Sequence, residues 1–171
     1  LEALRPPLGY ALDAAVGTTY SLDLETLLAV PLGFAMLDWD NDQGSLARTP
    51  VALLHALRRC ADRTTVFCHA GHIAATTRRH VLFSYLEPMV VQAHAPNGKG
   101  AFHAKTWLLR FTDAGGSIAY RFICLSRNLT TDHSWDTILT LDGELTGRTR
   151  AIAVNHPLGE FIERLESCAD I

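Results

Sequence analysis

The order of strand-like and helix-like segments constrains the fold of this chain more than any other sequence feature. In the first half, apolar runs of strand type at 10–20 and 64–70 alternate with helical patterns, the clearest of which begins at Pro50. In the second half, the strand-type runs 102–111 and 120–126 follow one another across a glycine-containing turn. Alternation favours parallel strands joined by helices, and direct succession favours hairpins. We therefore predict an α/β fold in which a mixed β-sheet is flanked by helices on both faces, an αβα sandwich.

Further elements follow from the same patterns. The apolar stretch 22–37 is interrupted by acidic residues and Pro31, so it predicts a core helix, capped by Ser21 or Asp23, rather than a membrane span. The other expected elements are a polar loop over 38–45, a helix over 49–62 capped by Thr49, a short helix from 78 that stops before Pro88, strands over 89–95 and 136–143, and a closing helix over 155–171. We treat residues 1–171 as a single domain, and because the sequence opens without Met we expect a fragment of a longer protein.

The composition limits the partners that this domain can have. With 15 Lys and Arg against 18 Asp and Glu, the formal charge is −3, so nucleic acid would have to bind a local basic patch. The four cysteines form no CxxC pair and are expected to be free thiols in a reduced cytoplasm. The sequence shows no signal-peptide pattern and no apolar run of about 18 residues, so we predict a cytoplasmic location and no membrane partner.

The stretch GAFHAKTWLLRF, residues 100–111, places His103 and Lys105 two positions apart in an apolar run. In a strand, such residues share one face and lie about 7 Å apart, close enough to bracket a small anion. An imidazole can act as a nucleophile or a proton carrier near neutral pH, and an ammonium suits a phosphate oxygen. Taken alone, the pair also fits the polar outer face of an edge strand.

A second polar group follows at the end of the next expected strand. In CLSRNLT, Ser126 and Asn128 are again two apart and offer uncharged hydrogen-bond donors. Across a hairpin they could meet His103 and Lys105. In DHSWD, Asp136 could accept a proton from the second nitrogen of a histidine and fix its tautomer.

The combination of HxK with a later SxN resembles the phospholipase D superfamily, whose signature is HxKxxxxD followed by GSxN. FHAKTWLLRF, SRNLT and SWD look especially similar to bacterial phospholipase D-like domains of nuclease and defence-type proteins. The resemblance spans residues 10–143, although only 102–136 carry specific motif letters. Two positions depart from the family pattern: Arg110 stands where the family has Asp, and Leu125 stands where it has Gly next to the phosphate.

The resemblance implies cleavage of a phosphodiester through a covalent phosphohistidine, without a metal or another cofactor. The implied catalytic roles are His103 as nucleophile, Lys105 and Asn128 as holders of the phosphate oxygens, Ser126 as an assisting donor, and Asp136 as the group that orients His103. In the family, a second copy of the motif supplies a histidine that protonates the leaving oxygen. Only one of the eight histidines, His103, has Lys two positions on, so a homodimer or a second HxK-bearing domain is expected.

Other residues are candidates for contact with the substrate. We expect Arg127, Tyr20, Trp135 and His69 to line the site, although both aromatic residues could instead pack in the core. His69 and His72 follow a strand that is expected to end near the site, but with Cys68 they do not form a zinc-ligand pattern. The remaining basic residues either form solvated surface or contact a polyanion backbone; they are Arg78, Arg79, His80 and Lys99.

Three functions compete at this point. The first is a nuclease that acts on nucleic acid, DNA rather than RNA. The second is a phospholipase D-type lipid hydrolase, which shares the chemistry, although no amphipathic insertion helix is evident. The third is a catalytically inactive nucleic-acid-binding or dimerisation module, which Arg110 and Leu125 favour.

Overall fold

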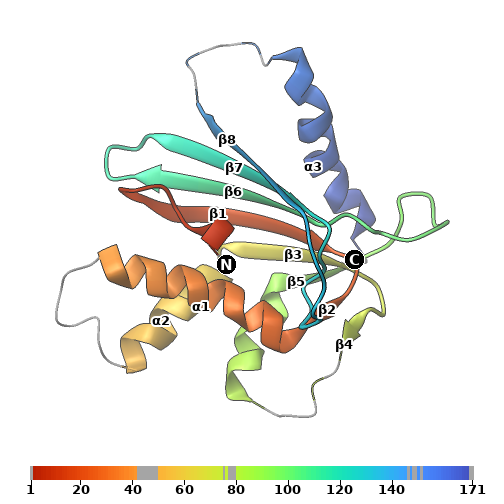
Figure 1. The fold of residues 1–171 in the computed structure, drawn as a ribbon, viewed down its shortest axis with the longest axis horizontal. Helices are drawn as coiled ribbons and strands as arrows, with labels where there is room; N and C mark the ends of the chain where they lie inside the picture. The colour runs from red at the N-terminus through yellow and green to blue at the C-terminus, as the bar shows by residue number, and fades with distance from the viewer. Residues whose placement is uncertain are drawn as a thin grey trace.

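The computed structural model describes residues 2–41, 50–74, 76, 80–145, 147, 150 and 152–169, and its centre is a six-stranded sheet (Figure 1). The strands lie in the order β5-β3-β1-β6-β7-β8. Their bounds are β1 Tyr10–Thr19, β3 Thr64–His69, β5 Val90–Ala93, β6 Thr106–Asp113, β7 Ile118–Leu125 and β8 Ile138–Glu144. A small second sheet pairs β2, Leu22–Asp23, with β4, Ile73–Ala74.

The sheet is mixed, as the segment order predicts. Strands β1, β3 and β5 are parallel to one another, whereas β6 is antiparallel to β1, and β6, β7 and β8 form an antiparallel meander. The division follows the connections, because helical segments separate the parallel strands, whereas the loops 114–117 and 126–137 that join the antiparallel strands contain no helix.

Helices cover both faces of this sheet, which confirms the predicted α/β architecture (Figure 1). Helices α1, Leu24–Asn41, and α2, Pro50–Ala61, lie on one face, and α3, His156–Cys168, lies on the other. Asp23 caps α1, because its Oδ1 accepts a hydrogen bond of 2.6 Å from the N–H of Thr26. None of the described helices is long and apolar enough to cross a membrane.

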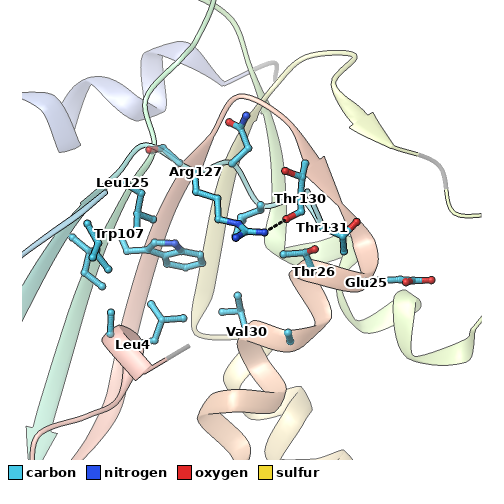
Figure 2. Close-up of a pocket in the computed structure, with 16 residues that line it drawn as sticks. Leu4, Glu25, Thr26, Val30, Trp107, Leu125, Arg127, Thr130 and Thr131 are labelled. Atoms are coloured by element: carbon cyan, nitrogen blue, oxygen red, sulfur yellow. Dashed lines mark hydrogen bonds between the residues drawn. The ribbon is translucent and has the colours of Figure 1, made fainter. Parts of the chain in front are cut away.

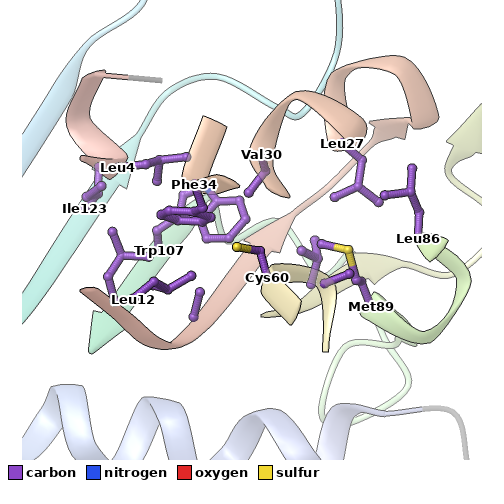
Figure 3. Packing of buried hydrophobic residues seen from close by; sticks show 14 of the residues in the cluster. Leu4, Leu12, Leu27, Val30, Phe34, Cys60, Leu86, Met89, Trp107 and Ile123 are labelled. Carbon is purple, nitrogen blue, oxygen red and sulfur yellow. The ribbon is translucent and has the colours of Figure 1, made fainter. Parts of the chain in front are cut away.

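Each face has its own buried cluster. On the side of α1 and α2, Leu27, Val30 and Phe34 pack with Cys60 against strand residues that include Trp107 (Figure 3). On the side of α3, a smaller cluster joins the helix to strand residues and to the segment before β6: Phe67, Ala93, Phe102, Leu165 and Cys168. Burial of one such aliphatic or aromatic side chain contributes about 1.5–3 kcal/mol.

The predicted strand at 102–111 is displaced in the structure. Strand β6 begins at Thr106, so His103 and Lys105 precede the strand and do not lie within it. The reason is that β1 ends at Thr19 and pairs with β6 only as far as Thr106. Residues 101–105 therefore cross the end of the sheet without a strand partner from β1.

Two helical predictions also need correction. Helix α1 continues to Asn41, so the first part of the predicted loop 38–45 is helical, and residues 42–45 lie outside the described residues, as does the predicted cap Thr49. The predicted short helix before Pro88 consists of two 3-10 turns, Val81–Tyr85 and Glu87–Met89. Pro88 lies inside the second turn, where its missing N–H leaves no bond unmade.

Strand β8 forms one edge of the sheet and is exposed along its whole length. Its exposed side chains include Leu139 and Leu141 on one face of the strand and Ile138 on the other. An ion pair of 2.6 Å between Asp142 and Arg121 of β7 is the charged contact across this strand pair.

The indole of Trp107 on β6 lies so close to the backbone of β1 at Gly17 that only glycine fits at this position. A Cβ atom at Gly17 of β1 would lie 2.9 Å from two ring carbons of Trp107, its partner on β6. Trp107 is 3% exposed and fixed in the cluster shown in Figure 3, so the indole has little freedom to retreat.

We predict that Gly17→Ala lowers the free energy of unfolding by about 1–3 kcal/mol, because the added methyl overpacks the indole. Gly143→Ala is the matched control, since a Cβ in that strand meets nothing within 4 Å. Urea denaturation should show a change within about 0.5 kcal/mol for the control. Equal stability of the two variants would contradict the packing described.

Candidate functional site

The polar residues of both sequence motifs lie at one end of the sheet. Strands β1, β3 and β7 all end there, and the chain enters β6 and β8 from the same end, as the pairing of Thr18 with Thr106 and of Leu125 with Ile138 shows. Loops at the ends of strands are where open α/β sheets place their ligands. This end, from Tyr20 to the segment before β6, is the candidate site.

His103 and Lys105 are in direct contact. The Nζ atom of Lys105 lies 3.2 Å from Nδ1 and 3.1 Å from Nε2 of His103, and it donates a hydrogen bond of 3.3 Å to the His103 carbonyl. The Lys105 side chain is buried, whereas His103 is exposed. Burial lowers the pKa of the Lys105 ammonium. A desolvated cation therefore lies beside an imidazole that solvent or a substrate can reach.

Tyr20 brings three histidines together. Its ring centroid lies 4.9 Å from that of His103, 4.3 Å from that of His72 and 5.3 Å from that of His69. The Tyr20 hydroxyl is 3.3 Å from Nε2 of His72, which is hydrogen-bonding distance. His69 accepts a bond of 3.4 Å at Nδ1 from the N–H of Phe102, next to His103. Tyr20 and His69 thus lie near His103, as the sequence led us to expect, and their contact with a substrate stays a prediction.

The loop that carries His69 and His72 is held at several points. The buried thiol of Cys68 lies 3.6–3.8 Å from the carbonyl oxygens of Tyr20, His69 and His72. Gly71, at a φ of +77°, allows the tight turn between the two histidines.

The SxN motif and the acidic residue form a separate polar network. Asp136 accepts hydrogen bonds from Ser126 Oγ at 3.1 Å and from Arg127 at 3.4 Å. Ser126 in turn accepts the N–H of Thr137 at 2.9 Å. Among the described residues no hydrogen bond joins Asp136 to His103, and the orienting role of Asp136 stays a prediction. Asp136 lies before β8, beside the end of β7, where it bonds to Ser126 and Arg127.

Asn128 links this network to the aromatic cluster. Its Oδ1 accepts a hydrogen bond of 3.3 Å from the N–H of Tyr20. That bond orients the amide, and within the described part of the chain its NH2 group has no hydrogen-bond partner. Arg127 is tied back by the carbonyl oxygens of Thr130, at 3.1 Å, and Asp132, at 2.6 Å.

The structure answers two questions that the motif comparison raised. Arg110 forms an ion pair with Asp13 of the neighbouring strand β1, on the surface and away from His103. Leu125 is half-buried, donates its N–H to the Lys105 carbonyl at 2.9 Å and so fixes the segment that carries Lys105.

Trp135 is fully exposed and does not pack in the core. Arg78 and Arg79 lie outside the described residues.

A cavity of about 510 Å³ lies beside the site, between α1 and the sheet (Figure 2). Leu4, Val30 and Trp107 form its apolar side, and Arg127 reaches over it toward Thr130. Asn128 is among the residues that line this cavity, and through its bond to Tyr20 it also belongs to the candidate site. The apolar lining is unsuited to a phosphate group.

The described residues hold no group of three or more His, Cys, Asp or Glu side chains placed to bind a metal ion. The rings of His69 and His72 contact each other at 4.8 Å between centroids. The sequence indicated that these two histidines follow a strand ending near the site. It did not indicate that Tyr20 contacts both of them and His103, because ring contacts over such separations leave no local pattern.

Comparisons with known proteins support the fold. No family model matches the chain, and no curated protein matches it. Among solved structures, a mutant of the yeast tyrosyl-DNA phosphodiesterase, a member of the phospholipase D superfamily, matches with a TM-score of 0.54 and 11% identity. The match covers 91% of this chain and 31% of the yeast enzyme, so the chain spans about a third of that protein's length. At this identity the likeness concerns the fold alone.

We predict an alkaline loss of stability that depends on Cys68. Burial raises the pKa of its thiol from 9.0 to about 11, so above pH 9 the unfolded state loses this proton before the folded state does. The free energy of unfolding should therefore fall by about 2 kcal/mol between pH 9 and pH 11 through this group. Denaturant titrations at several pH values would measure it.

The comparison uses Cys68→Ala, which should be less stable overall but should lack this part of the pH dependence. Cys124→Ala is the control, because Cys124 is exposed and should leave the pH dependence unchanged. An identical pH slope in the parent and in Cys68→Ala would refute the assignment.

Proposed function

We propose that this domain is a metal-independent phosphodiesterase, and specifically a nuclease module, that acts through a phosphohistidine on His103. The contact between exposed His103 and buried Lys105 is the observation that carries the proposal. An imidazole that a substrate can reach thus lies directly beside a buried ammonium, and a phosphohistidine mechanism needs such a pair. The likeness in fold to a tyrosyl-DNA phosphodiesterase supports phosphodiester chemistry at this end of the sheet.

The reaction requires charge stabilisation as the phosphorus gains its fifth oxygen or nitrogen neighbour. The Lys105 ammonium and the Asn128 NH2 group, which has no partner among the described residues, are the donors that would hold the non-bridging oxygens. Lys105 is positioned by its bond to the His103 carbonyl, and Asn128 by its bond to Tyr20. Such donors are most effective when they are fixed before the substrate arrives, because no reorganisation is then needed in the transition state.

The polar network after β7 takes a supporting role in this proposal. Asp136 holds Ser126 and Arg127, so Ser126 is kept beside the site as an assisting donor and Arg127 supplies a cation to the substrate backbone. Asp136 thus acts on the SxN motif instead of on His103. Trp135, fully exposed in the same loop, is available to stack on a base.

Nucleic acid, and DNA in particular, is the proposed substrate. The name of the yeast enzyme describes action on DNA. On a chain of net charge −3, Lys99 and Arg127 are the basic side chains proposed to meet the backbone, and Arg127 must exchange its ion pairs with Asp132 and Asp136 to do so. A lipid phosphodiester shares the chemistry, and an inactive binding module shares the fold. Leu125 and Arg110 favour the inactive module on sequence grounds, but their contacts leave His103 and Lys105 free to act. The cytoplasmic location and the defence role stay predictions.

Turnover also requires a second group that carries protons. The sequence assigns it to a second HxK motif, from a homodimer partner or from another domain. Sedimentation of the active species tests the homodimer.

We predict that the chain cleaves single- or double-stranded DNA and bis(p-nitrophenyl) phosphate in excess chelator. His103→Ala should abolish turnover, because no other group takes its place as nucleophile. Lys105→Met should reduce kcat by about 10²–10³ through the loss of one charge-stabilising donor. Release of nitrophenolate and of labelled DNA fragments would be measured.

His55→Ala is the matched control, since His55 is exposed on α2, away from the site, and should retain the parent's activity. Cleavage of phosphatidylcholine but not DNA would identify the lipid hydrolase. Binding of DNA by parent and His103→Ala alike, without any cleavage, would identify the inactive module and reject the enzyme.

A further inference from the structure

The position of Asn128 depends on the segment 127–131, which follows β7 and belongs to no helix or strand apart from an isolated bridge between Leu129 and Leu22. All five of its residues line the cavity of Figure 2. On that flank the segment faces open volume instead of packed side chains. Hydrogen bonds to neighbouring elements must therefore supply much of the support that keeps the Asn128 amide in place.

Asp23, the last residue of β2, bonds to this segment through both its side chain and its backbone. Its Oδ2 accepts the N–H of Thr131 at 2.9 Å, and its own N–H donates to the Leu129 carbonyl at 2.8 Å. Its other oxygen, Oδ1, accepts the N–H of Thr26 at 2.6 Å and caps α1. A carboxylate can serve two N–H groups at once, because both of its oxygens accept hydrogen bonds. One side chain thus ties the start of α1 to the segment that carries Asn128.

Thr19 supports the same segment from the end of β1. Its side chain is buried, and its Oγ1 accepts the N–H of Leu129 at 3.1 Å. Leu129 is therefore held at its N–H by Thr19 and at its carbonyl by Asp23. Asn128 directly precedes this doubly bonded residue, and its own Oδ1 accepts the N–H of Tyr20. The backbone around Asn128 has little freedom to shift while both supports are present.

We propose that Asp23 is a positioning residue for Asn128. Its carboxylate holds the segment 127–131 against the start of α1, and so it keeps the Asn128 amide where it can donate to a phosphate oxygen. The inference rests on the proposed function, because it takes from that proposal the role of Asn128. The bonds of Asp23 run to Leu129, Thr131 and the first turn of α1, so it acts through the segment and not on the phosphate. A displacement of about 1 Å in such a donor can lower a rate by about 10².

The test replaces Asp23 by Asn. Asn is as good a helix cap as Asp, because its carbonyl oxygen can accept the N–H of Thr26, but it then turns an NH2 group toward Thr131, where an acceptor is needed. The variant Asp23→Asn should therefore stay folded, with a far-UV circular dichroism spectrum like that of the parent. Asp113→Asn is the matched control, since Asp113 accepts the N–H of Ser117 at 2.7 Å in the turn at the opposite end of the sheet.

Binding of inorganic phosphate, measured by NMR titration, tests the inference without turnover. Asn128→Ala should raise the Kd by about 10–10², because it removes one hydrogen bond to a charged group. Asp23→Asn should raise the Kd by about 3–30, which is a part of the same loss. The double variant should bind phosphate no more weakly than Asn128→Ala alone, because Asp23 acts only through Asn128. Asp113→Asn should keep the Kd of the parent.

Cleavage of bis(p-nitrophenyl) phosphate repeats this cycle in the transition state. For Asp23→Asn, kcat/KM should fall by about 10–10². The same substitution in the Asn128→Ala protein should cause no further loss. A residue that merely stabilises the fold would instead lower kcat/KM by the same factor in both backgrounds, so additive losses would overturn the inference. Asp23→Ser is a second variant, because Ser also caps a helix but has a single side-chain oxygen, and it should show the same non-additive loss.

The possible results separate the inference from the proposed function. A parent-like Kd and kcat/KM in both Asp23 variants would overturn the inference and leave the proposed function standing. A parent chain that binds phosphate but cleaves nothing would reject the enzyme, and the binding cycle would still decide the role of Asp23. A parent chain that neither binds phosphate nor cleaves the ester would reject the proposed function, and the inference with it.

Discussion

The end of β1 at Thr19 is the constraint on which the site depends. This central strand pairs in parallel with β3 and antiparallel with β6, and its last pair with β6 joins Thr18 to Thr106. Because β1 stops there, the segment with His103 and Lys105 has no β1 partner and crosses the strand ends. Tyr20, the next residue after β1, then meets that segment. A longer β1 would extend the ladder and draw the two motif residues into a regular sheet surface.

The sequence was sufficient to predict the architecture because the fold depends on regular patterns. Apolar periodicity, Asp23 as a cap and Pro50 at a helix start are local signals, and each gave the right element. The residues at which strands begin and end do not follow from such local signals. Nothing in FHAKTWLLRF shows that the partner strand β1 stops at Thr19, so the predicted strand began too early. The start of β6 depends on its pairing with β1.

The sequence proposed members of a site but did not show their contacts. The structure brings His103, Lys105 and Asn128 to one end of the sheet. Asp136 there bonds to its neighbours Ser126 and Arg127. Residue types show what a group can do, whereas the partner that it finds depends on geometry over short distances. The contact between Tyr20 and His72 joins residues 52 positions apart, and no spacing rule reports such a pair.

The exposed strand β8 has a consequence for assembly. An edge strand offers unpaired backbone groups, and β8 adds apolar side chains on both faces, so another strand can extend the sheet there by backbone hydrogen bonding. Strands added at this edge would extend the sheet perpendicular to the strand direction, whereas His103 and its neighbours lie beyond the strand ends. A larger protein built outward from β8 would therefore enlarge the sheet without covering the end that carries His103 and Lys105.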